Sequence, residues 1–406
     1  MIRVLQISIE VNSGSVGRIA EQIGERILDN NGESYITYAR NNLPSKSATV
    51  KIGNQLGVLW HVLMTRISDN HGFESKRATE NLIKYINKLK PSIIHLHHLH
   101  GYFVNIEILF NFLSKMNIPV VWTFHDCWSF TGHCTHYEAV GCERWKTQCY
   151  ECPQKNEYPK SVILDRSFKN YIQKKELFNK VKNLTIVPVS YWLEEEVKKS
   201  FLKNHKTKVI HNGIDLNKFH PKKSKNAVLR QYGLDQNITI ILGVASTWSH
   251  KKGLEYFSSV ADLLDGENYR VILVGLDDLQ ISSLNKNIIG IKRTESVEEL
   301  ADLYSAADVF VNPTLEESLG LTNIEALACG TPVVTFKSGG SPECINVDTG
   351  IVVDKGDLKG LVSAIVEIVT NSKQFYTKNC VQRAHSLFNK NDRYDEYIDL
   401  YKSLIR

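Results

Sequence analysis

The chain has 406 residues, of which 42% are hydrophobic and 23% are charged. This length and composition predict two or three globular domains and exclude a single small module, a disordered polyelectrolyte and a fibrous repeat. The net charge of +5 is a mild basic bias, not the clustered excess of a dedicated nucleic-acid binder. The segment Met1–Ile9 lacks the pattern of a signal peptide, and no run is long enough for a spanning helix, so we expect a cytoplasmic protein with reduced cysteines.

Short β-branched runs alternate with amphipathic helical patterns, which is typical of βαβ units and parallel sheets. The strands expected in the first half are Val4–Ile9, Tyr35–Ala39, Ile93–His97, Val120–Phe124 and Thr185–Val189. Those expected in the second half are Ile238–Val244, Arg270–Gly275, Ile288–Ile291, Val309–Asn312 and Pro332–Phe336. The covering helices are predicted at Val16–Asp29, Glu74–Leu89, Lys252–Leu264, Val297–Ala306 and Leu358–Val369. The pattern predicts an α/β protein of two doubly wound parallel-sheet domains.

The expected domains are residues 1–215, with a cysteine-rich insert at 132–159, and residues 216–385. An exposed joint is predicted near Ile214–Ser224, where Asn-Gly, a proline and several lysines occur together. Residues 386–406 carry a last amphipathic pattern, Tyr394–Leu404, whose packing partner the sequence leaves open. Because parallel sheets bind ligands beyond the carboxyl ends of their strands, two facing halves predict a cleft between two sets of loops.

Two loops carry the pattern of an anion site. After the first strand, Gly14, Ser15, Gly17 and Arg18 stand where a helix begins, so backbone N–H groups and a guanidinium could meet an anion, although a capped tight turn explains the same residues. The second loop is the segment Asn312–Pro332, in which Gly320 precedes a helix start. Its two carboxylates, Glu317 and Glu325, are costly beside an anion unless they accept hydrogen bonds, and sugar hydroxyls supply such donors. The second loop therefore predicts a nucleotide-sugar site.

With this block the chain resembles the retaining glycosyltransferases of family 4, which have the GT-B fold of two Rossmann-like domains facing across a cleft. The resemblance covers nearly the whole chain through the glycine loop, Ile-His-Leu-His97, Thr-Phe-His125-Asp, Val-Ile-His-Asn212-Gly213-Ile-Asp215, the Lys252-Gly253 turn and the block Glu317–Pro332. The family's surface-polysaccharide enzymes are the nearest in kind.

The resemblance implies a role for each matching residue. Glu317 holds the donor sugar, Glu325 holds the ribose diol, and Lys252 neutralises the leaving diphosphate. The backbone N–H groups of Gly320, Leu321 and Thr322 face that diphosphate, and the loop of Gly14, Ser15 and Arg18 lies near it. His125 matches the family's histidine beside the sugar. The chain departs from the family at Thr247, where many members carry an arginine. Either Lys251 or His250 replaces that charge, or the site is less electropositive.

Histidines and cysteines raise the question of metals. His95, His97, His98 and His100 form a cluster in the sequence. His95 and His97 share a face of one expected strand and His98 does not, so a role at the acceptor site or in the structure is favoured over metal ligation. His125 and Asp126 are adjacent on an extended segment, so they point apart and do not form a catalytic dyad. In the insert, Cys149-x-x-Cys152 with Cys134 and Cys142 has the spacing of a structural zinc site, the alternative being reduced cysteines packed under a loop.

The function expected is sugar transfer from a nucleoside-diphosphate sugar to a hydroxyl of a glycan or lipid-linked glycan in surface-polysaccharide synthesis, with retention at the anomeric carbon. No Asp-x-Asp motif is present to hold a metal at the diphosphate, so catalysis is expected to need no cofactor. The alternatives are a nucleotide-sugar epimerase of the same fold and a zinc-knuckle nucleic-acid binder, which the modest charge disfavours. The basic segments Lys76–Lys90 and Lys169–Lys182 suggest peripheral contact with the inner face of an anionic membrane, the alternative being solvated helices.

Overall fold

The computed structural model of the protein describes residues 1–223 and 225–405. The chain forms two compact units, the first made of Met1–His211 and the segment from Arg393 onward, the second of Asn212–Asp392. The division falls slightly before the boundary expected at residue 215. The expected joint, Ile214–Ser224, follows it directly, and its last residue, Ser224, lies outside the described residues. Among the described helices, none is both long and apolar enough to cross a bilayer.

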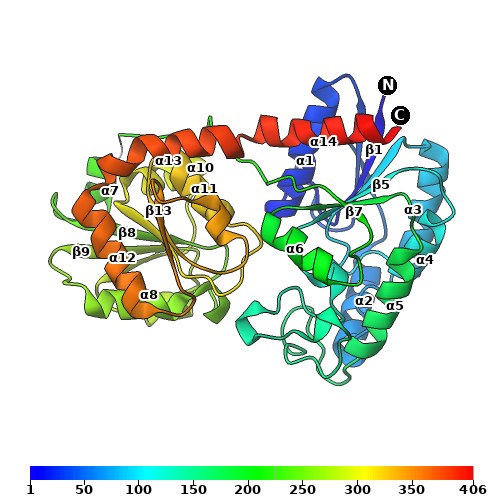
Figure 1. Ribbon diagram of the computed structural model, residues 1–406, viewed down its shortest axis with the longest axis horizontal. Helices are drawn as coiled ribbons and strands as arrows, with labels where there is room; N and C mark the ends of the chain where they lie inside the picture. The colour runs from blue at the N-terminus through cyan, green and yellow to red at the C-terminus, as the bar shows by residue number, and fades with distance from the viewer. Residues whose placement is uncertain (224, 406) are drawn as a thin grey trace. The chain divides into compact units, whose positions relative to one another are not determined.

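The first unit is built on a parallel sheet of seven strands in the order β3-β2-β1-β4-β5-β6-β7 (Figure 1). The strands are β1 (Arg3–Ile7), β2 (Glu33–Tyr38), β3 (Ala48–Lys51), β4 (Ile93–Leu96), β5 (Val120–Phe124), β6 (Leu184–Pro188) and β7 (Lys206–Thr207). The five expected strands of this half are confirmed. The two edge strands, β3 and β7, were not expected because each is short and neither is buried on both faces.

Six helices belong to the same half of the chain: α1 (Gly14–Asp29), α2 (Gln55–Ser68), α3 (Lys76–Leu89), α4 (Ile106–Leu113), α5 (Ser167–Asn179) and α6 (Tyr191–Lys199). Between β5 and α5 the chain makes three 3-10 turns, η1 (Trp128–Phe130), η2 (Glu138–Val140) and η3 (Arg144–Lys146). This stretch contains the cysteine-rich insert.

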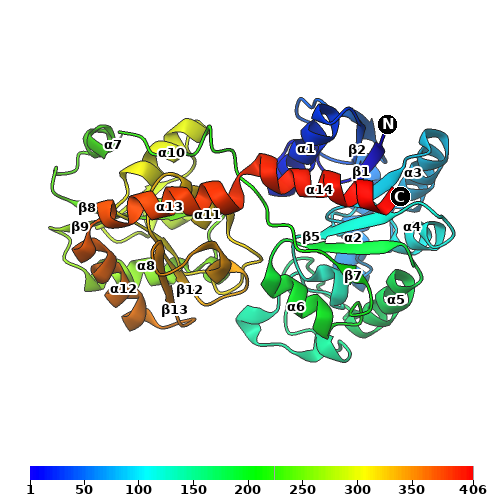
Figure 2. The same ribbon diagram turned by 45° about the horizontal axis from the view of Figure 1, so that its top comes forward.

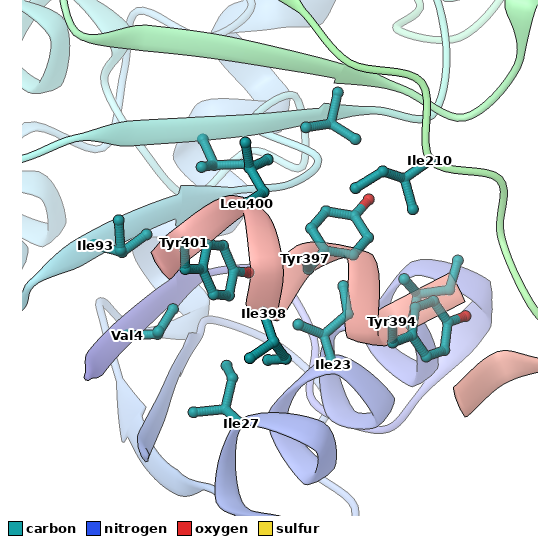
Figure 3. Close-up of a cluster of buried hydrophobic side chains, with 13 residues drawn as sticks. Val4, Ile23, Ile27, Ile93, Ile210, Tyr394, Tyr397, Ile398, Leu400 and Tyr401 are labelled. Carbon is teal, nitrogen blue, oxygen red and sulfur yellow. The ribbon is translucent and has the colours of Figure 1, made fainter. Parts of the chain in front are cut away.

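The C-terminal helix α14 (Lys390–Ile405) packs on the first unit, which answers the question that the sequence left open. Its apolar face joins a cluster of buried side chains from the sheet and α1, shown in Figure 3. The helix supplies Tyr394, Tyr397, Ile398, Leu400 and Tyr401 to this cluster. Arg26 of α1 also forms a two-pronged ion pair with Asp395 of α14, with N–O distances of 2.9 and 2.8 Å.

The second unit is a parallel sheet of six strands in the order β10-β9-β8-β11-β12-β13. The strands are β8 (Thr239–Val244), β9 (Tyr269–Val274), β10 (Ile288–Ile291), β11 (Val309–Asn312), β12 (Val333–Phe336) and β13 (Gly350–Val353). The five expected strands are confirmed, and β13 is added at the edge. Its helices are α7 (Lys225–Gln231), α8 (Leu254–Leu263), α9 (Asp278–Ser282), α10 (Val297–Ala306), α11 (Leu321–Ala328), α12 (Leu358–Asn371) and α13 (Lys373–Phe388), with the 3-10 turns η4 (His250–Lys252) and η5 (Ser341–Cys344). Helix α13 packs against α11 (Figure 2).

Both sheets reverse their strand order beside the first strand of the unit, between β1 and β4 and between β8 and β11. In doubly wound folds the loops at this switch point bind the ligand. The expected α/β class with two Rossmann-like domains is therefore confirmed, and the loops that carry the predicted residues follow the strands at the two switch points.

Candidate active site

The loops after β8 and β11 meet in the second unit through Lys252 and Glu317. The Nζ of Lys252 lies 2.8 Å from Oε2 of Glu317. Gly253, which ends the turn, has a φ of +75°, and a Cβ there would lie 2.2 Å from the carbonyl oxygen of Pro313. Only glycine allows the loops to approach so closely. Two residues predicted for one site, far apart in sequence, are thus brought into contact.

Helix α11 begins beside this ion pair. Its N-cap is Gly320, with a φ of +95°, and Leu321 and Thr322 in the first turn are half-buried. The first N–H groups of a helix have no acceptor within it and carry the positive end of its dipole. This part of the site has the chemistry to bind an anion.

A chain of buried polar side chains supports the start of α11, and no sequence pattern indicated it. Asn323 accepts from Nδ2 of Asn312 at 2.8 Å and donates to Oγ of Ser341 at 2.8 Å. Oγ of Ser341 lies 2.7 Å from Oγ1 of Thr335 on the neighbouring strand. These side chains come from four separate elements, β11, α11, β12 and η5, so only the tertiary structure identifies them as the support of the helix start.

Glu325 occupies the second turn of α11, and Oη of Tyr304 on α10 donates to its carboxylate at 2.9 Å. Burial and the charge of Glu325 raise the pKa of Tyr304 well above its usual value, so this hydroxyl stays protonated and remains a donor. Tyr304 therefore holds the half-buried carboxylate of Glu325 in place.

No side chain of the described residues simply replaces the positive charge of the arginine that many family members carry at the position of Thr247. Thr247 is exposed and donates to the carbonyl of Ser246. The two proposed substitutes are already engaged by carboxylates, since Nζ of Lys251 lies 2.9 Å from Glu316 and Nδ1 of His250 lies 2.5 Å from Glu255. Of the two lysines in this turn, Lys252 is the one that pairs with a predicted site residue, Glu317.

In the first unit, the glycine loop forms the N-terminus of α1. Gly14 has a φ of +61°, Ser15 and Arg18 are exposed, and Nε of Arg18 donates to the carbonyl of Gly14 at 3.0 Å. The guanidinium is therefore held next to the start of the helix. These three predicted residues lie together at the carboxyl edge of the first sheet, after β1.

His125 stands at the end of β5, with its Nε2 3.4 Å from Nδ1 of His97, whose Nε2 lies 3.0 Å from Oε1 of Gln6. Burial lowers the pKa of His125 well below its usual value, so the ring is neutral near pH 7. The carboxylate of Asp126 instead faces His100, with Oδ2 2.7 Å from Nε2 of that ring. The interpretation that His125 and Asp126 do not form a dyad is confirmed.

The histidines separate into two groups. His95 and His97 share a face of β4, with ring centroids 4.1 Å apart, as the strand alternation predicted. His98, His100 and Asp126 form a second group, whose ligand atoms all lie within 4.8 Å of one another. Among the described residues this is the one such group of histidine, cysteine and acidic side chains. The sequence argument favoured roles other than ligation for these histidines, whereas the structure gathers donor atoms that would suit a cation.

The four cysteines of the insert, Cys134, Cys142, Cys149 and Cys152, line one cavity of about 10 Å³. No disulfide joins cysteines within the described residues. The sequence predicted that the four belong to one constellation, and the structure brings them around one small space.

Two family models match adjoining parts of the chain. Residues 53–218 match the model described as Glycosyltransferase Family 4, and residues 238–371 match the model described as Glycosyl transferases group 1. With two Rossmann-like units and these two matches, the protein is a glycosyltransferase with the GT-B fold. It belongs to glycosyltransferase family 4, as the resemblance of its motifs implied.

Similar proteins support this assignment across the chain. The "Putative colanic acid biosynthesis glycosyl transferase WcaC" of Escherichia coli K12 is 22% identical over 99% of this chain and 100% of its own length. A UDP-Gal:alpha-D-GlcNAc-diphosphoundecaprenol alpha-1,3-galactosyltransferase of Escherichia coli is 27% identical over 52% of this chain and 56% of its own. Nothing in these matches points to the alternative of an epimerase.

Solved structures agree in fold. Sucrose-phosphate synthase of Thermosynechococcus elongatus has a TM-score of 0.73 at 20% identity, covering 100% of this chain and 99% of its own. HepE of Anabaena, solved in complex with UDP, has a TM-score of 0.70 at 15% identity, covering 99% and 100%. The protein transfers a sugar, and its place is in glycan or polysaccharide synthesis.

Proposed function

We propose that the protein moves a sugar from a nucleoside-diphosphate sugar to a hydroxyl of a glycan or lipid-linked glycan, with retention and without a metal at the diphosphate. The observation that carries the proposal is the Lys252–Glu317 pair beside the N-terminus of α11, which offers a cation, a carboxylate and backbone N–H groups in one place. A nucleotide sugar has the complementary groups: phosphate oxygens, sugar hydroxyls and a ribose diol.

The donor exchanges partners with the pair when it binds. Lys252 turns from Glu317 to the phosphate oxygens, and Glu317 accepts hydrogen bonds from sugar hydroxyls instead. Each charge thereby keeps a partner throughout, which avoids the cost of a desolvated, unpaired ion. As the diphosphate leaves, Lys252 and the N–H groups of α11 stabilise the charge that builds on it. Basic side chains and a helix dipole do this work in the proposal, so a divalent ion is not needed there.

Retention follows from the roles that remain. With the donor bound, Glu317 is committed to the sugar hydroxyls, which leaves it unsuited to act as a nucleophile. The leaving phosphate then accepts the acceptor's proton on the face from which it departs. His125, neutral near pH 7, is a hydrogen-bond group for the sugar, and Gly14, Ser15 and Arg18 supply further donors for phosphate oxygens.

The nucleotide is expected to be held through its ribose by Glu325, whose carboxylate Tyr304 orients. Among the similar proteins, HepE was solved in complex with UDP, and the galactosyltransferase is named for UDP-Gal. Uracil is therefore the first base to test. The same galactosyltransferase acts on a diphosphoundecaprenol-linked sugar, which makes a lipid-linked acceptor the first to try.

An exposed apolar face on the first unit supports a membrane-bound acceptor. Along α2 the side chains of Leu56, Leu59, Trp60, Leu63 and Ile67 are 76, 63, 54, 46 and 41% exposed. Val162, Ile163 and Leu164 lie against the end of this helix, with backbone hydrogen bonds to Arg66 and Ile67, and they are exposed as well. We call these eight residues the α2 face. Contiguous apolar surface of this kind marks an interaction site.

Positive charge around the α2 face favours an anionic bilayer as its occupant. Arg66 is exposed on the same helix, Nζ of Lys155 contacts the carbonyl of Ile163, and Lys76 and Arg77 share one cavity wall with Leu56 and Trp60. Apolar side chains with flanking basic residues are the pattern of proteins that rest in the headgroup region. Within Lys169–Lys182, the segment expected to contact the membrane, Lys174 cannot take part, because it is buried and donates to backbone carbonyls.

The donor proposal is tested by incubating the protein with UDP-sugars and GDP-sugars, with and without a lipid-linked glycan, and analysing the anomeric configuration of the product. Inversion would overturn the mechanism, and release of an isomerised sugar without an acceptor would overturn the reaction.

The membrane proposal is tested by flotation with vesicles of phosphatidylglycerol and phosphatidylcholine. Leu59→Glu with Leu63→Glu should abolish binding, whereas Phe375→Glu, at an exposed phenylalanine of the second unit, should not. Vesicle binding of the double variant equal to that of the wild type would contradict a bilayer as the occupant of the α2 face. So would a double variant that loses a dimer of the protein instead of vesicle binding.

A further inference from the structure

The cysteine-rich insert encloses a space of the size of one ion. Its cavity of about 10 Å³ is lined by Cys134, Cys142, Cys149 and Cys152 and by His133. A volume near 10 Å³ holds about one water-sized sphere. Residues 132–159 contain 3-10 turns and bends and no described α-helix or β-strand, so regular backbone hydrogen bonding contributes little to their order. Such a segment usually needs a covalent or metal crosslink.

The sulfur atoms already interact with one another and with the backbone. The thiols of Cys134 and Cys152 lie close enough to interact with one another. The backbone N–H of Gly132 donates to Sγ of Cys149 at 3.2 Å. A Cβ at Gly132 would lie 2.1 Å from the carbonyl oxygen of Ser167, so the glycine is required for the chain to bring this donor to the sulfur. A donor aimed at sulfur stabilises a thiolate more than a thiol.

His133 provides a second, independent sign of a ligand. Its Nδ1 lies 2.6 Å from Oδ1 of Asp69, and the side chains of both residues have 0% exposure. Because a carboxylate only accepts, Nδ1 carries the proton of that bond. The other ring nitrogen, Nε2, is buried without a hydrogen-bond partner in the described structure, and its ring forms part of the cavity wall. A carboxylate that orients a histidine toward a buried space is a common arrangement beside protein-bound metals.

We propose that this cavity binds one zinc ion through the thiolates of Cys134, Cys142, Cys149 and Cys152, with His133 packed against the sulfur atoms and positioned by Asp69. No three of these sulfur atoms lie within 4.8 Å of one another in the described structure, so the ion would draw them together into a tetrahedron. Four Zn–S bonds form, and the four thiol protons pass to solvent. His133 Nε2 then faces thiolates, and when the ring takes up a second proton from solvent, its Nε2–H donates to them.

Buried positive charge offsets the two negative charges of such a centre. Lys174 of α5 is 1% exposed, donates to the carbonyls of Trp128 and Thr131, and lies near enough to Cys134 and Cys149 to interact with their charge. Arg144 also borders the cavity and donates to the carbonyls of Tyr150 and Glu151. Burial lowers the pKa of Lys174 to about 7, and thiolates beside it, like the charges of Asp69 and Asp126, favour its charged form.

The ion would order the loop after β5. The N–H of Cys127 donates to the carbonyl of Thr135 at 2.8 Å, and Thr131 donates to the carbonyl of Cys134. The insert is thereby tied to the segment that follows His125 and Asp126. Metal binding is measured on the whole protein without substrate, so this inference stands or falls separately from the proposed reaction.

The first test is metal analysis of full-length protein purified without chelator. About one zinc per chain is expected, and Cys149→Ser with Cys152→Ser should reduce it to near zero. Cys329→Ser, at a buried cysteine of the second unit, should keep the zinc. Zinc-free wild-type protein that does not take up added Zn²⁺ would overturn the proposal. Because the double variant could fail to fold, the wild-type result is decisive by itself.

Cobalt substitution of the wild-type protein tests the ligand set. Co²⁺ held by four thiolates gives tetrahedral d–d bands and sulfur-to-cobalt charge-transfer absorption that scales with the number of sulfur ligands. A three-sulfur spectrum that becomes weaker or shifts in His133→Gln would overturn the four-cysteine assignment. Removing the metal should also speed tryptic cleavage after Arg144 and Lys146 in the insert, and re-adding Zn²⁺ should reverse it. Cleavage that is insensitive to metal would contradict the ordering role.

Discussion

Oη of Tyr401 lies 2.7 Å from Nδ1 of His95, which joins the last helix of the chain to β4 in the first unit. The other ring nitrogen of His95 lies 2.7 Å from Oγ1 of Thr123 on β5, and the ring stacks near His97. His97 in turn contacts His125. The C-terminal helix therefore supports the buried histidine layer beneath a predicted site residue.

Replacing Tyr401 by phenylalanine should destabilise the first unit without changing the shape of its core. The change removes one buried hydrogen bond and leaves a ring nitrogen of His95 unpaired, at a cost of about 1–3 kcal/mol. Thermal unfolding checks it, with Tyr150→Phe at an exposed tyrosine of the insert as the control. An unchanged melting temperature would mean that the helix is held by its apolar contacts alone.

Lys252→Ala and Glu317→Gln should each lower turnover by roughly ten- to a hundredfold, the loss of one charge-assisted hydrogen bond of about 1.5–3 kcal/mol in the transition state. Both residues are partly exposed, so the fold should stay intact. Steady-state kinetics on the two variants and on Lys359→Ala, an exposed lysine of α12, provide the comparison. Wild-type turnover in both site variants would remove these residues from the donor site.

Glu325→Ala should weaken nucleotide binding rather than the chemical step, because a ribose is held alike in the ground and transition states. Calorimetry with UDP and GDP measures this directly. Tyr304→Phe, which removes the hydroxyl that orients the carboxylate, should reproduce part of the loss. Equal affinity of the Glu325 variant and the wild type for the preferred nucleotide would contradict the ribose role.

The first unit should lose stability as the pH falls below about 6.5. Burial lowers the pKa of His61, His95 and His98 to about 3, so these rings are neutral when folded and take up protons when unfolded. The unfolded state then binds more protons, and stability drops by about 1.4 kcal/mol per pH unit for each such histidine. Tryptophan fluorescence follows the unfolding, since Trp122, Trp128 and Trp145 are buried in this unit. His95→Gln should reduce the slope of the unfolding free energy against pH by the equivalent of about one proton, whereas His385→Gln, at an exposed position, should not. A free energy of unfolding that stays constant between pH 6.5 and 4.5 would contradict the effect of burial.

Turnover should not rise when Mg²⁺ or Mn²⁺ is added to protein that retains its own metal content, because Lys252 and the start of α11 are expected to neutralise the diphosphate. The assay compares rates with each ion and with a weak chelator that leaves tightly bound zinc in place. Strict dependence on added Mg²⁺ would overturn the metal-independent part of the mechanism.

The sequence alone determined the class of the fold and ten of its strands, because these strands are short, largely apolar runs between helical patterns. It also singled out Glu317, Gly320 and Glu325, since a glycine at a helix start and carboxylates beside an anion site are local patterns. Lys252 was singled out by the resemblance of its motif to the family. Edge strands such as β13 were not predicted, because a strand exposed on one side does not form a largely apolar run.

Only the tertiary structure decided what distant segments do together. It paired Lys252 with Glu317, packed α14 on the first unit, and gathered His98, His100 and Asp126 although the strand alternation separates His98 from its neighbours. It also showed that Asp69 and His133 meet behind the cysteines, and that α2 presents an apolar face that no local pattern had singled out. Such contacts depend on which loops the sheet order places side by side, and a pattern read along one segment contains no information about the segment it will meet.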